Sequence, residues 1–283
     1  MIYLLLAILC SSLISIIIKL SKNYVNNKIM MFLMNYVVCT ICSLFFIGNL
    51  DEINNNEFVF PIWFGIITGF GYLGCFLLLE LNIRKNGVVL SSTFSKLGLI
   101  VPIFIAIVFY HDTPSIVKII GIILAIIAII IMNVEFKKKD INIKSFNIMN
   151  LLLILLLIFG GLTDASSTIF EHTSNFNLKG LFLFVIFFSA LIISLIILLI
   201  EHKKISYKDI LFGICIGIPN YFSSFFLLNS LNSLNAVVVY PTYSVSTIVI
   251  ITIVGVVFFK EKLKINEIIG MLIIITSIIL LNV

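Results

Sequence analysis

Lys96 is the residue whose position most needs a chemical explanation. It lies about ten residues inside the apolar segment Gly87–Tyr110, which places it about 15 Å along a helix that rises roughly 1.5 Å per residue. A charge at that depth in a bilayer is costly, and such residues usually serve function. We therefore expect Lys96 to meet an anionic group of a substrate or a coupling carboxylate. The alternative is a structural ion pair inside the helix bundle.

Two acidic residues are the candidates for coupling transport to protons, because burial disfavours an ionised carboxylate. Asp164 lies in the apolar segment Phe146–Phe170, beside the small and polar residues Gly160-Gly161 and Ser166-Ser167-Thr168. Glu80 lies near a segment end, and Arg84 follows four residues later, which is the spacing of an ion pair on one helix face. Each carboxylate also has a structural interpretation. Asp164 could accept a hydrogen bond from a neighbouring helix, and Glu80 could form an ion pair with Arg84.

Polar side chains near the centres of other apolar segments are the candidates for lining a substrate cavity. A tyrosine that is buried needs a partner for its hydroxyl, and a polar cavity provides one. Serine is also suited to close helix packing in lipid, so packing is the competing explanation. Pro219 is expected to interrupt its helix and free backbone carbonyls. With Lys96, the predicted substrate-binding residues are Tyr72, Ser95, Asn220, Tyr221, Tyr240, Tyr243 and Ser244.

The sequence contains no pattern that indicates an enzyme, a cofactor or a metal site. Its three histidines, His111, His172 and His202, are scattered over segment ends. The Cys39-x-x-Cys42 pair lies in an apolar segment with no second pair nearby, which fits cysteine as a small hydrophobe. No nucleotide-binding loop, zinc motif or nucleophile motif is present. The protein is therefore predicted to be no enzyme, and to bind no cofactor, metal or nucleic acid.

The segments that carry these residues must be membrane-spanning helices. The chain of 283 residues is 61% hydrophobic and only 11% charged, too few charges to cover a water-exposed surface of this size. Backbone polar groups in lipid must be satisfied within their own segment, so each long apolar run is helical. Ten spans are predicted, namely Ile2–Leu20, Ile29–Gly48, Phe58–Leu81, Gly87–Tyr110, Ile116–Met132, Phe146–Phe170, Leu178–Ile200, Asp209–Ser230, Ala236–Phe259 and Ile265–Val283.

The two halves of the chain repeat one another. One constant spacing relates Tyr72 to Tyr221, Thr93 to Thr242, Ser95 to Ser244 and Gly121 to Gly270. Five helices in each half place the second half upside down in the membrane, a plan typical of secondary transporters with the substrate site at the repeat interface. We assign residues 1–135 to the first repeat, 136–145 to a cytoplasmic connecting loop and 146–283 to the second repeat.

Charge in the loops predicts the orientation. Basic residues collect on alternate loops, and the positive-inside rule places these in the cytoplasm. Both termini are then outside a cell membrane that the chain crosses many times, and Asn142 is expected inside with Asn54 outside. The basic loops contain Lys22, Lys28, Arg84, Lys85, Lys137 to Lys144, Lys203 to Lys208 and Lys260 to Lys264.

Each repeat of five helices has short loops and a turn before its last helix. These turns are Tyr110-His111-Asp112-Thr113-Pro114 and Phe259-Lys260-Glu261-Lys262-Leu263. In these features the chain resembles the EamA-type ten-helix transporters of the drug/metabolite transporter superfamily. Asp112 stands where that family commonly has Glu. The resemblance covers the whole chain. It implies a central cavity between the repeats, lined mainly by the third, fourth, eighth and ninth helices, but it implies no particular substrate.

The sequence therefore predicts a secondary transporter that moves a small metabolite by alternating access. The solute is expected to be an amino acid, another carboxylate-bearing molecule or a drug, with protons as a candidate coupling ion. The runner-up is a component of a flippase for a lipid or lipid-linked substrate, because a lipid-facing groove leaves little trace in a sequence. A non-transporting sensor would need a signalling domain, and none is present. Both a monomer and a homodimer fit the sequence.

Overall fold

The computed structural model describes residues 1–48, 55–133, 148–201, 204–260 and 265–282. None of the described residues forms a strand, so the predicted all-helical fold is confirmed. The described residues form eleven α-helices and two short 3₁₀ turns, η1 (Asn55–Phe58) and η2 (Phe176–Leu178). The α-helices are α1 (Ile2–Ser21), α2 (Lys28–Phe45), α3 (Val59–Asn86), α4 (Val88–Leu97), α5 (Ile100–Phe109), α6 (Ile116–Asn133), α7 (Ile148–Thr173), α8 (Lys179–Glu201), α9 (Tyr207–Leu231), α10 (Ala236–Val257) and α11 (Ile265–Asn282).

Nine of the ten predicted spans correspond to one helix each, and the fourth is divided into α4 and α5. The division falls at Gly98 and Leu99, directly after Lys96. Pro102 has no N–H, so the carbonyl of Gly98 cannot make its usual helical hydrogen bond. That carbonyl accepts instead from the N–H of Val101, at 2.9 Å. The result is a tight turn in the middle of the span, beside the lysine.

Pro219 does not have the expected effect. Helix α9 continues through it from Tyr207 to Leu231, and α10 likewise contains Pro241 without interruption. Both prolines are themselves buried, so neighbouring helices hold the chain in place despite the lost hydrogen bond. The prediction of a broken helix at Pro219 is therefore wrong.

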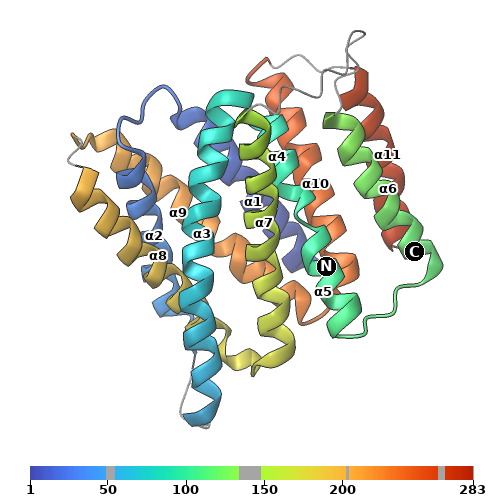
Figure 1. The fold of residues 1–283 in the computed structure, drawn as a ribbon, viewed down its shortest axis with the longest axis horizontal. Coiled ribbons are helices and arrows are strands. Elements are labelled where there is room, and N and C mark those ends of the chain that lie inside the picture. The colour runs from blue at the N-terminus through green and yellow to red at the C-terminus, as the bar shows by residue number, and fades with distance from the viewer. Residues whose placement is uncertain (49–54, 134–147, 202–203, 261–264, 283) are drawn as a thin grey trace.

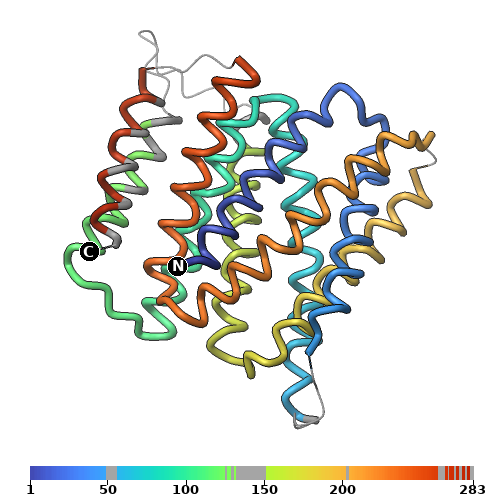
Figure 2. Tube along the Cα trace, turned by 180° about the vertical axis from the view of Figure 1, so that it is seen from behind, coloured from blue at the N-terminus to red at the C-terminus, as the bar shows by residue number. Residues whose placement is uncertain are grey.

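Helices of one half pack against helices of the other half. Helix α1 lies along α9, α2 packs on α8 and α9, and α3 packs on α7 and α8. Helices α4 and α5 both pack on α7, whereas α6 and α11 form a pair of their own at one edge of the bundle (Figure 1). Seen from behind, α1 in dark blue again runs beside α9 in orange (Figure 2). The interface between the halves is thus the interior of the molecule.

Glycines allow these helices to approach closely. A Cβ atom added to Gly69 on α3 would lie 2.7 Å from the carbonyl oxygen of Ile186 on α8. A Cβ on Gly213 of α9 would lie 2.4 Å from the carbonyl oxygen of Met31 on α2. The two glycines therefore occupy equivalent places. Each lies in the third membrane helix of its own half and packs against the second membrane helix of the other half. Small residues serve this purpose in membrane proteins, where close backbone contact drives helix association.

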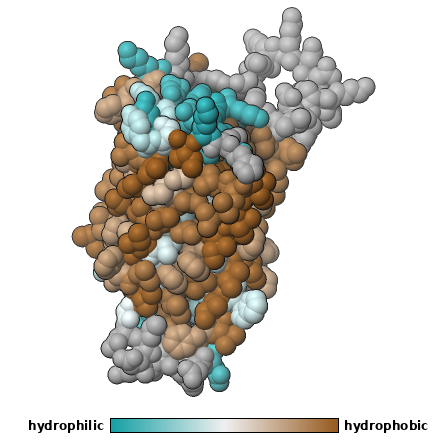
Figure 3. All heavy atoms as spheres, turned by 90° about the vertical axis from the view of Figure 1, so that its left-hand side faces the viewer, coloured by the Kyte–Doolittle hydropathy of each residue, from teal (hydrophilic) through white to brown (hydrophobic). Residues whose placement is uncertain are grey.

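The outer surface is that of a membrane protein. Figure 3 shows a broad apolar band with polar side chains gathered at one end of the bundle. Among the described residues, eight helical spans are long and apolar enough to cross a membrane, and α4 with α5 counts as one of them. At one end of the bundle, Lys22 follows α1, Lys28 begins α2, and Arg84 and Lys85 lie in the last turn of α3. We call this the basic end. Asn54 and Asn142, for which the loop charges predict opposite sides of the membrane, lie outside the described residues.

Candidate functional site

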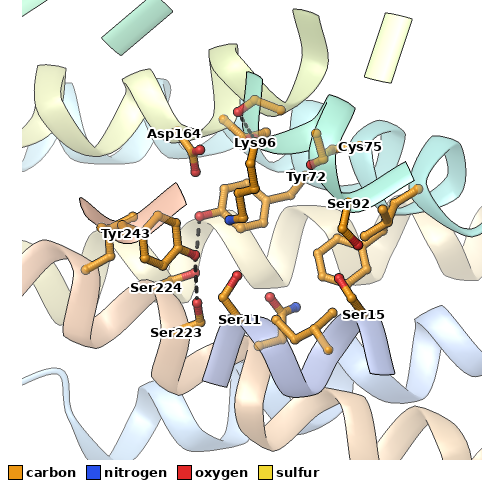
Figure 4. Close-up of a pocket in the computed structure, with 18 residues that line it drawn as sticks. Ser11, Ser15, Tyr72, Cys75, Ser92, Lys96, Asp164, Ser223, Ser224 and Tyr243 are labelled. Carbon is orange, nitrogen blue, oxygen red and sulfur yellow. Dashed lines mark hydrogen bonds between the residues drawn. The ribbon is translucent and has the colours of Figure 1, made fainter. Parts of the chain in front are cut away.

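A cavity of about 90 Å³ lies in the middle of the bundle, between the two halves. Six helices contribute to its wall, namely α1, α3, α4, α7, α9 and α10. Its polar lining is drawn in Figure 4, where side chains from both halves point toward one another. Pockets for drug-sized ligands are usually several times larger, about 300–1,000 Å³. In this conformation the cavity is therefore sized for a small solute or for part of one.

Lys96 lines the cavity from the last turn of α4. Its ammonium lies 4.0 Å from the ring centroid of Tyr243 on α10, a cation–π contact between the two halves. The Tyr243 hydroxyl is in turn 3.1 Å from the hydroxyl of Ser223 on α9. An aromatic ring stabilises a desolvated cation by about 2 kcal/mol, which is well below the cost of burying one. The remaining stabilisation must come from other groups that face the cavity.

Asp164 on α7 lines the same cavity, a juxtaposition that the sequence does not reveal. Among the described residues, neither Asp164 nor Lys96 forms an ion pair, although each lies within electrostatic reach of the other. The first half thus contributes a cation and the second half an anion to one small space. The two charges balance one another across the cavity without direct contact.

Hydroxyl groups surround the two charges. The hydroxyl of Tyr72 on α3 is 3.2 Å from that of Ser224 on α9, so Tyr72 and Tyr243 each pair with one of two adjacent serines. Ser95 lies beside Lys96 and lines the cavity. Asn220 also lines it, and its amide donates to Asn35 Oδ1 at 3.1 Å. A polar solute would find both donors and acceptors here.

Three of the predicted substrate-binding residues lie outside the cavity lining. Tyr221 is fully buried among aromatic rings, with the ring of Phe225 stacked at 5.9 Å. Tyr240 donates from its hydroxyl to the carbonyl oxygen of Asp164 at 2.6 Å, so it supports the turn of α7 that carries this carboxylate. Ser244 is fully buried. Tyr221 and Ser244 are the repeat partners of Tyr72 and Ser95, so the repeat does not place both partners in the cavity.

Glu80 also lies outside the cavity lining. Its side chain is only 1% exposed and lies 2.7 Å from the ammonium of Lys28. It also pairs with Arg84, as the spacing of four residues predicts. Glu80 is therefore held among cations at the basic end, and Asp164 is the predicted coupling residue that lines the cavity.

Other lining residues were missed by the sequence reasoning. The first helix contributes two of them, Ser11 and Ser15, although it was not considered for the site. The signal available was a group of serines on an otherwise apolar helix. The other missed polar residues of the lining are Cys75, Ser92, Thr163, Ser223 and Ser224.

Comparison with known families accounts for this architecture. The profile of the EamA-like transporter family matches residues 1–134 and 147–283, which is nearly the whole chain in two parts. The chain belongs to the EamA-like transporter family. This family is part of the drug/metabolite transporter superfamily, as the resemblance predicted. The protein is thus a multi-pass membrane protein of a family that transports small molecules rather than one of enzymes.

Two similar proteins show how much of the chain the similarity covers. An uncharacterized protein of Haemophilus influenzae is 26% identical over 240 residues, which cover 80% of this chain and 78% of the relative. A protein of known crystal structure superimposes with a TM-score of 0.70 over 99% of this chain and 94% of its own. Its sequence is only 9% identical, so that likeness concerns the fold of this EamA-like protein and not its substrate.

Proposed function

We propose that this EamA-like protein is a secondary transporter that carries a small, water-soluble solute with an anionic group, such as a carboxylate, through the central cavity by alternating access. The observation that carries the proposal is the pair of unbridged opposite charges, Lys96 and Asp164, which come from different halves and face one cavity. A site between inverted repeats can be exposed to either side of the membrane by rocking one half against the other.

Lys96 is the proposed anchor for the anion. A lysine in a low-dielectric site favours an anionic neighbour strongly, and its ammonium faces the cavity rather than a carboxylate partner. The hydroxyls of Tyr72 and Ser95, with the amide of Asn220, would hydrogen-bond to the rest of the solute. The charged lining also supports a soluble solute over a lipid, whose acyl chains need an apolar groove.

Asp164 is the proposed coupling residue. In the empty carrier its carboxylate balances Lys96, and the cavity has no net charge. An anion that binds Lys96 would leave one excess negative charge, and moving a net charge through lipid is costly. Protonation of Asp164 would restore neutrality. The anionic solute and one proton would then cross the membrane in the same direction, and the empty carrier would return with the Lys96 and Asp164 charges balanced.

The test is transport by purified protein in liposomes with the substitution Lys96→Met. A panel of radiolabelled amino acids and monocarboxylates serves as the probe set, with and without an imposed pH gradient. Methionine keeps the length of the side chain but removes the charge, so the protein should fold and insert. Loss of one charge-assisted hydrogen bond corresponds to about a tenfold or greater fall in transport.

Two further variants make this test specific. Lys96→Arg should restore only part of the activity, because the guanidinium is wider and forked. Lys118→Met removes a lysine that does not line the cavity and should leave transport unchanged. Wild-type transport of every accepted solute by a well-folded Lys96→Met protein would show that Lys96 is structural, and the anionic-solute proposal would be wrong.

A further inference from the structure

Polar contacts tie helices together at the basic end of the bundle. The carboxylate of Glu80, near the end of α3, lies 2.7 Å from the ammonium of Lys28, the first residue of α2, and also pairs with Arg84. The loop after α1 is attached to the same place. The Lys22 ammonium donates to the carbonyl of Arg84 at 2.9 Å, and the Arg84 guanidinium donates to the carbonyl of Lys22 at 3.0 Å. Together these contacts join α1 and α2 to the end of α3.

A matching contact lies in the second half of the chain. Lys179 is the first residue of α8, and its ammonium donates to Oδ1 of Asn229 on α9 at 2.8 Å. Asn229 is the repeat partner of Glu80, at the same spacing that relates Tyr72 to Tyr221. Because the repeats are inverted, this second contact lies at the end of the bundle opposite to the first. Each end thus has one lysine that begins a helix and one polar partner near the end of the next membrane helix.

These contacts join helices whose main packing partners are other helices. Helix α2 packs on α8 and α9, whereas α3 packs on α7 and α8. Among the helices that line the cavity, α1 packs along α9, and α3 and α4 both pack on α7. We call these two groups the two walls of the cavity (Figure 4). A contact from α1 and α2 to the end of α3 therefore bridges the two walls at the basic end. Access to the cavity from that end requires it to break.

We propose that Glu80–Lys28 and Asn229–Lys179 are matching latches, one at each end of the transport path, and that their chemical difference biases the resting carrier toward closure at the basic end. The proposal rests on the transport function proposed above. At the basic end a buried carboxylate is paired with two cations, whereas at the opposite end a neutral amide accepts from one lysine. Two full charges of opposite sign attract one another more strongly than a charge and a neutral amide do.

Breaking the two latches would have unequal consequences. Opening the basic end separates Glu80 on α3 from Lys28 on α2, whereas the pair with Arg84 stays within α3. A buried charge that loses a charged partner is strongly disfavoured. Opening the other end separates the neutral amide of Asn229 from Lys179, which costs less free energy. The resting carrier should therefore expose its cavity more often at the end opposite to the basic one.

The native thiol of Cys75 provides a reporter, because it lines the cavity. The other cysteines, Cys10, Cys39, Cys42 and Cys215, are replaced by alanine, and the protein is reconstituted in oriented vesicles. A membrane-impermeant cationic methanethiosulfonate is then added from one side at a time. In the otherwise unchanged protein, Cys75 should react faster from the side opposite to the basic end.

Substitutions in the two latches should move this reactivity in opposite directions. Glu80→Gln should raise the rate from the basic end by about tenfold, the effect expected for loss of one charge-assisted contact. Asn229→Glu places a carboxylate beside Lys179 and should lower the rate from the opposite end. Glu201→Gln, an exposed carboxylate at the end of α8, is the control and should change neither rate.

The outcomes separate this proposal from the transport proposal, because labelling needs no substrate. Unchanged labelling in a monodisperse Glu80→Gln protein, or faster labelling from the opposite end in Asn229→Glu, would overturn the latch assignment. If Glu80→Gln does not fold, Asn229→Glu alone decides, because it adds a charge without removing a buried pair. A loss of transport in Lys96→Met with latch behaviour as expected would support both proposals independently.

Discussion

The point where Gly98 packs against Gly161 should be among the places in the molecule that least tolerate a larger side chain. Gly98 lies in the turn between α4 and α5, two residues after Lys96. A Cβ added there would lie 2.4 Å from the backbone nitrogen of Gly161 on α7 and 2.8 Å from its Cα. These are backbone atoms, so no side chain can rotate away. Gly98→Ala must push α4 away from α7, the two helices that carry Lys96 and Asp164.

The expected cost follows from this geometry. Overpacking of a close-packed interior costs about 1–3 kcal/mol, and replacing glycine by alanine in helical backbone returns about 0.5–1 kcal/mol. Because the added Cβ would meet backbone atoms that cannot move aside, the cost lies toward the upper end of the first range, and a net loss of about 1–2 kcal/mol remains. Since 1 kcal/mol moves the melting temperature of a chain above 150 residues by about 2–4 °C, Gly98→Ala should melt about 2–8 °C lower in detergent.

The matched control is Gly71→Ala on α3. A Cβ there would meet only Cγ2 of Thr163, at 3.3 Å, and that methyl group can move by a few tenths of an ångström. The measurement is the apparent melting temperature by fluorescence-detected size-exclusion chromatography, with all proteins in the same detergent. Gly71→Ala should melt within about 2 °C of the wild type. Equal melting temperatures for the two variants would refute the argument that backbone contact at Gly98 limits the approach of α4 to α7.

Three further predictions concern transport and orientation. Asp164→Asn should abolish accumulation driven by a pH gradient but retain exchange of labelled for unlabelled solute, and unchanged pH dependence would exclude proton coupling through this residue. Tyr243→Phe keeps the ring over Lys96 but loses one hydrogen bond, and should weaken solute binding by about fivefold. Tyr243→Leu also loses the cation–π contact, and should weaken solute binding by about tenfold more. A thermal-shift titration with the accepted solute measures both. Cysteines introduced in place of Asn142 and Asn54 should be labelled from the inside and the outside respectively, and labelling of both from one side would contradict the inverted ten-span topology.

Much of the architecture could be predicted from the sequence because lipid leaves few choices. An apolar run such as Ile2–Leu20 must close its hydrogen bonds within itself, so its composition and length predict a helix that the structure confirms as α1. The repeat could also be recognised, because residues such as Tyr72 and Tyr221 stand at one constant spacing. The depth of Lys96 in its span likewise followed from counting residues.

The composition of the cavity depended on tertiary packing. Tyr72 and Tyr221 are equivalent in sequence, yet only Tyr72 lines the cavity, because Tyr221 packs among the rings of Phe46 and Phe225. Asp164 faces the same space as Lys96 because α7 crosses α4 at Gly161 and Gly98. Helices that are apolar on every side carry no periodic pattern that says which face turns inward. The sequence by itself therefore determined the helices, their repeat and the buried charges, whereas the contacts between helices decided which of those side chains meet.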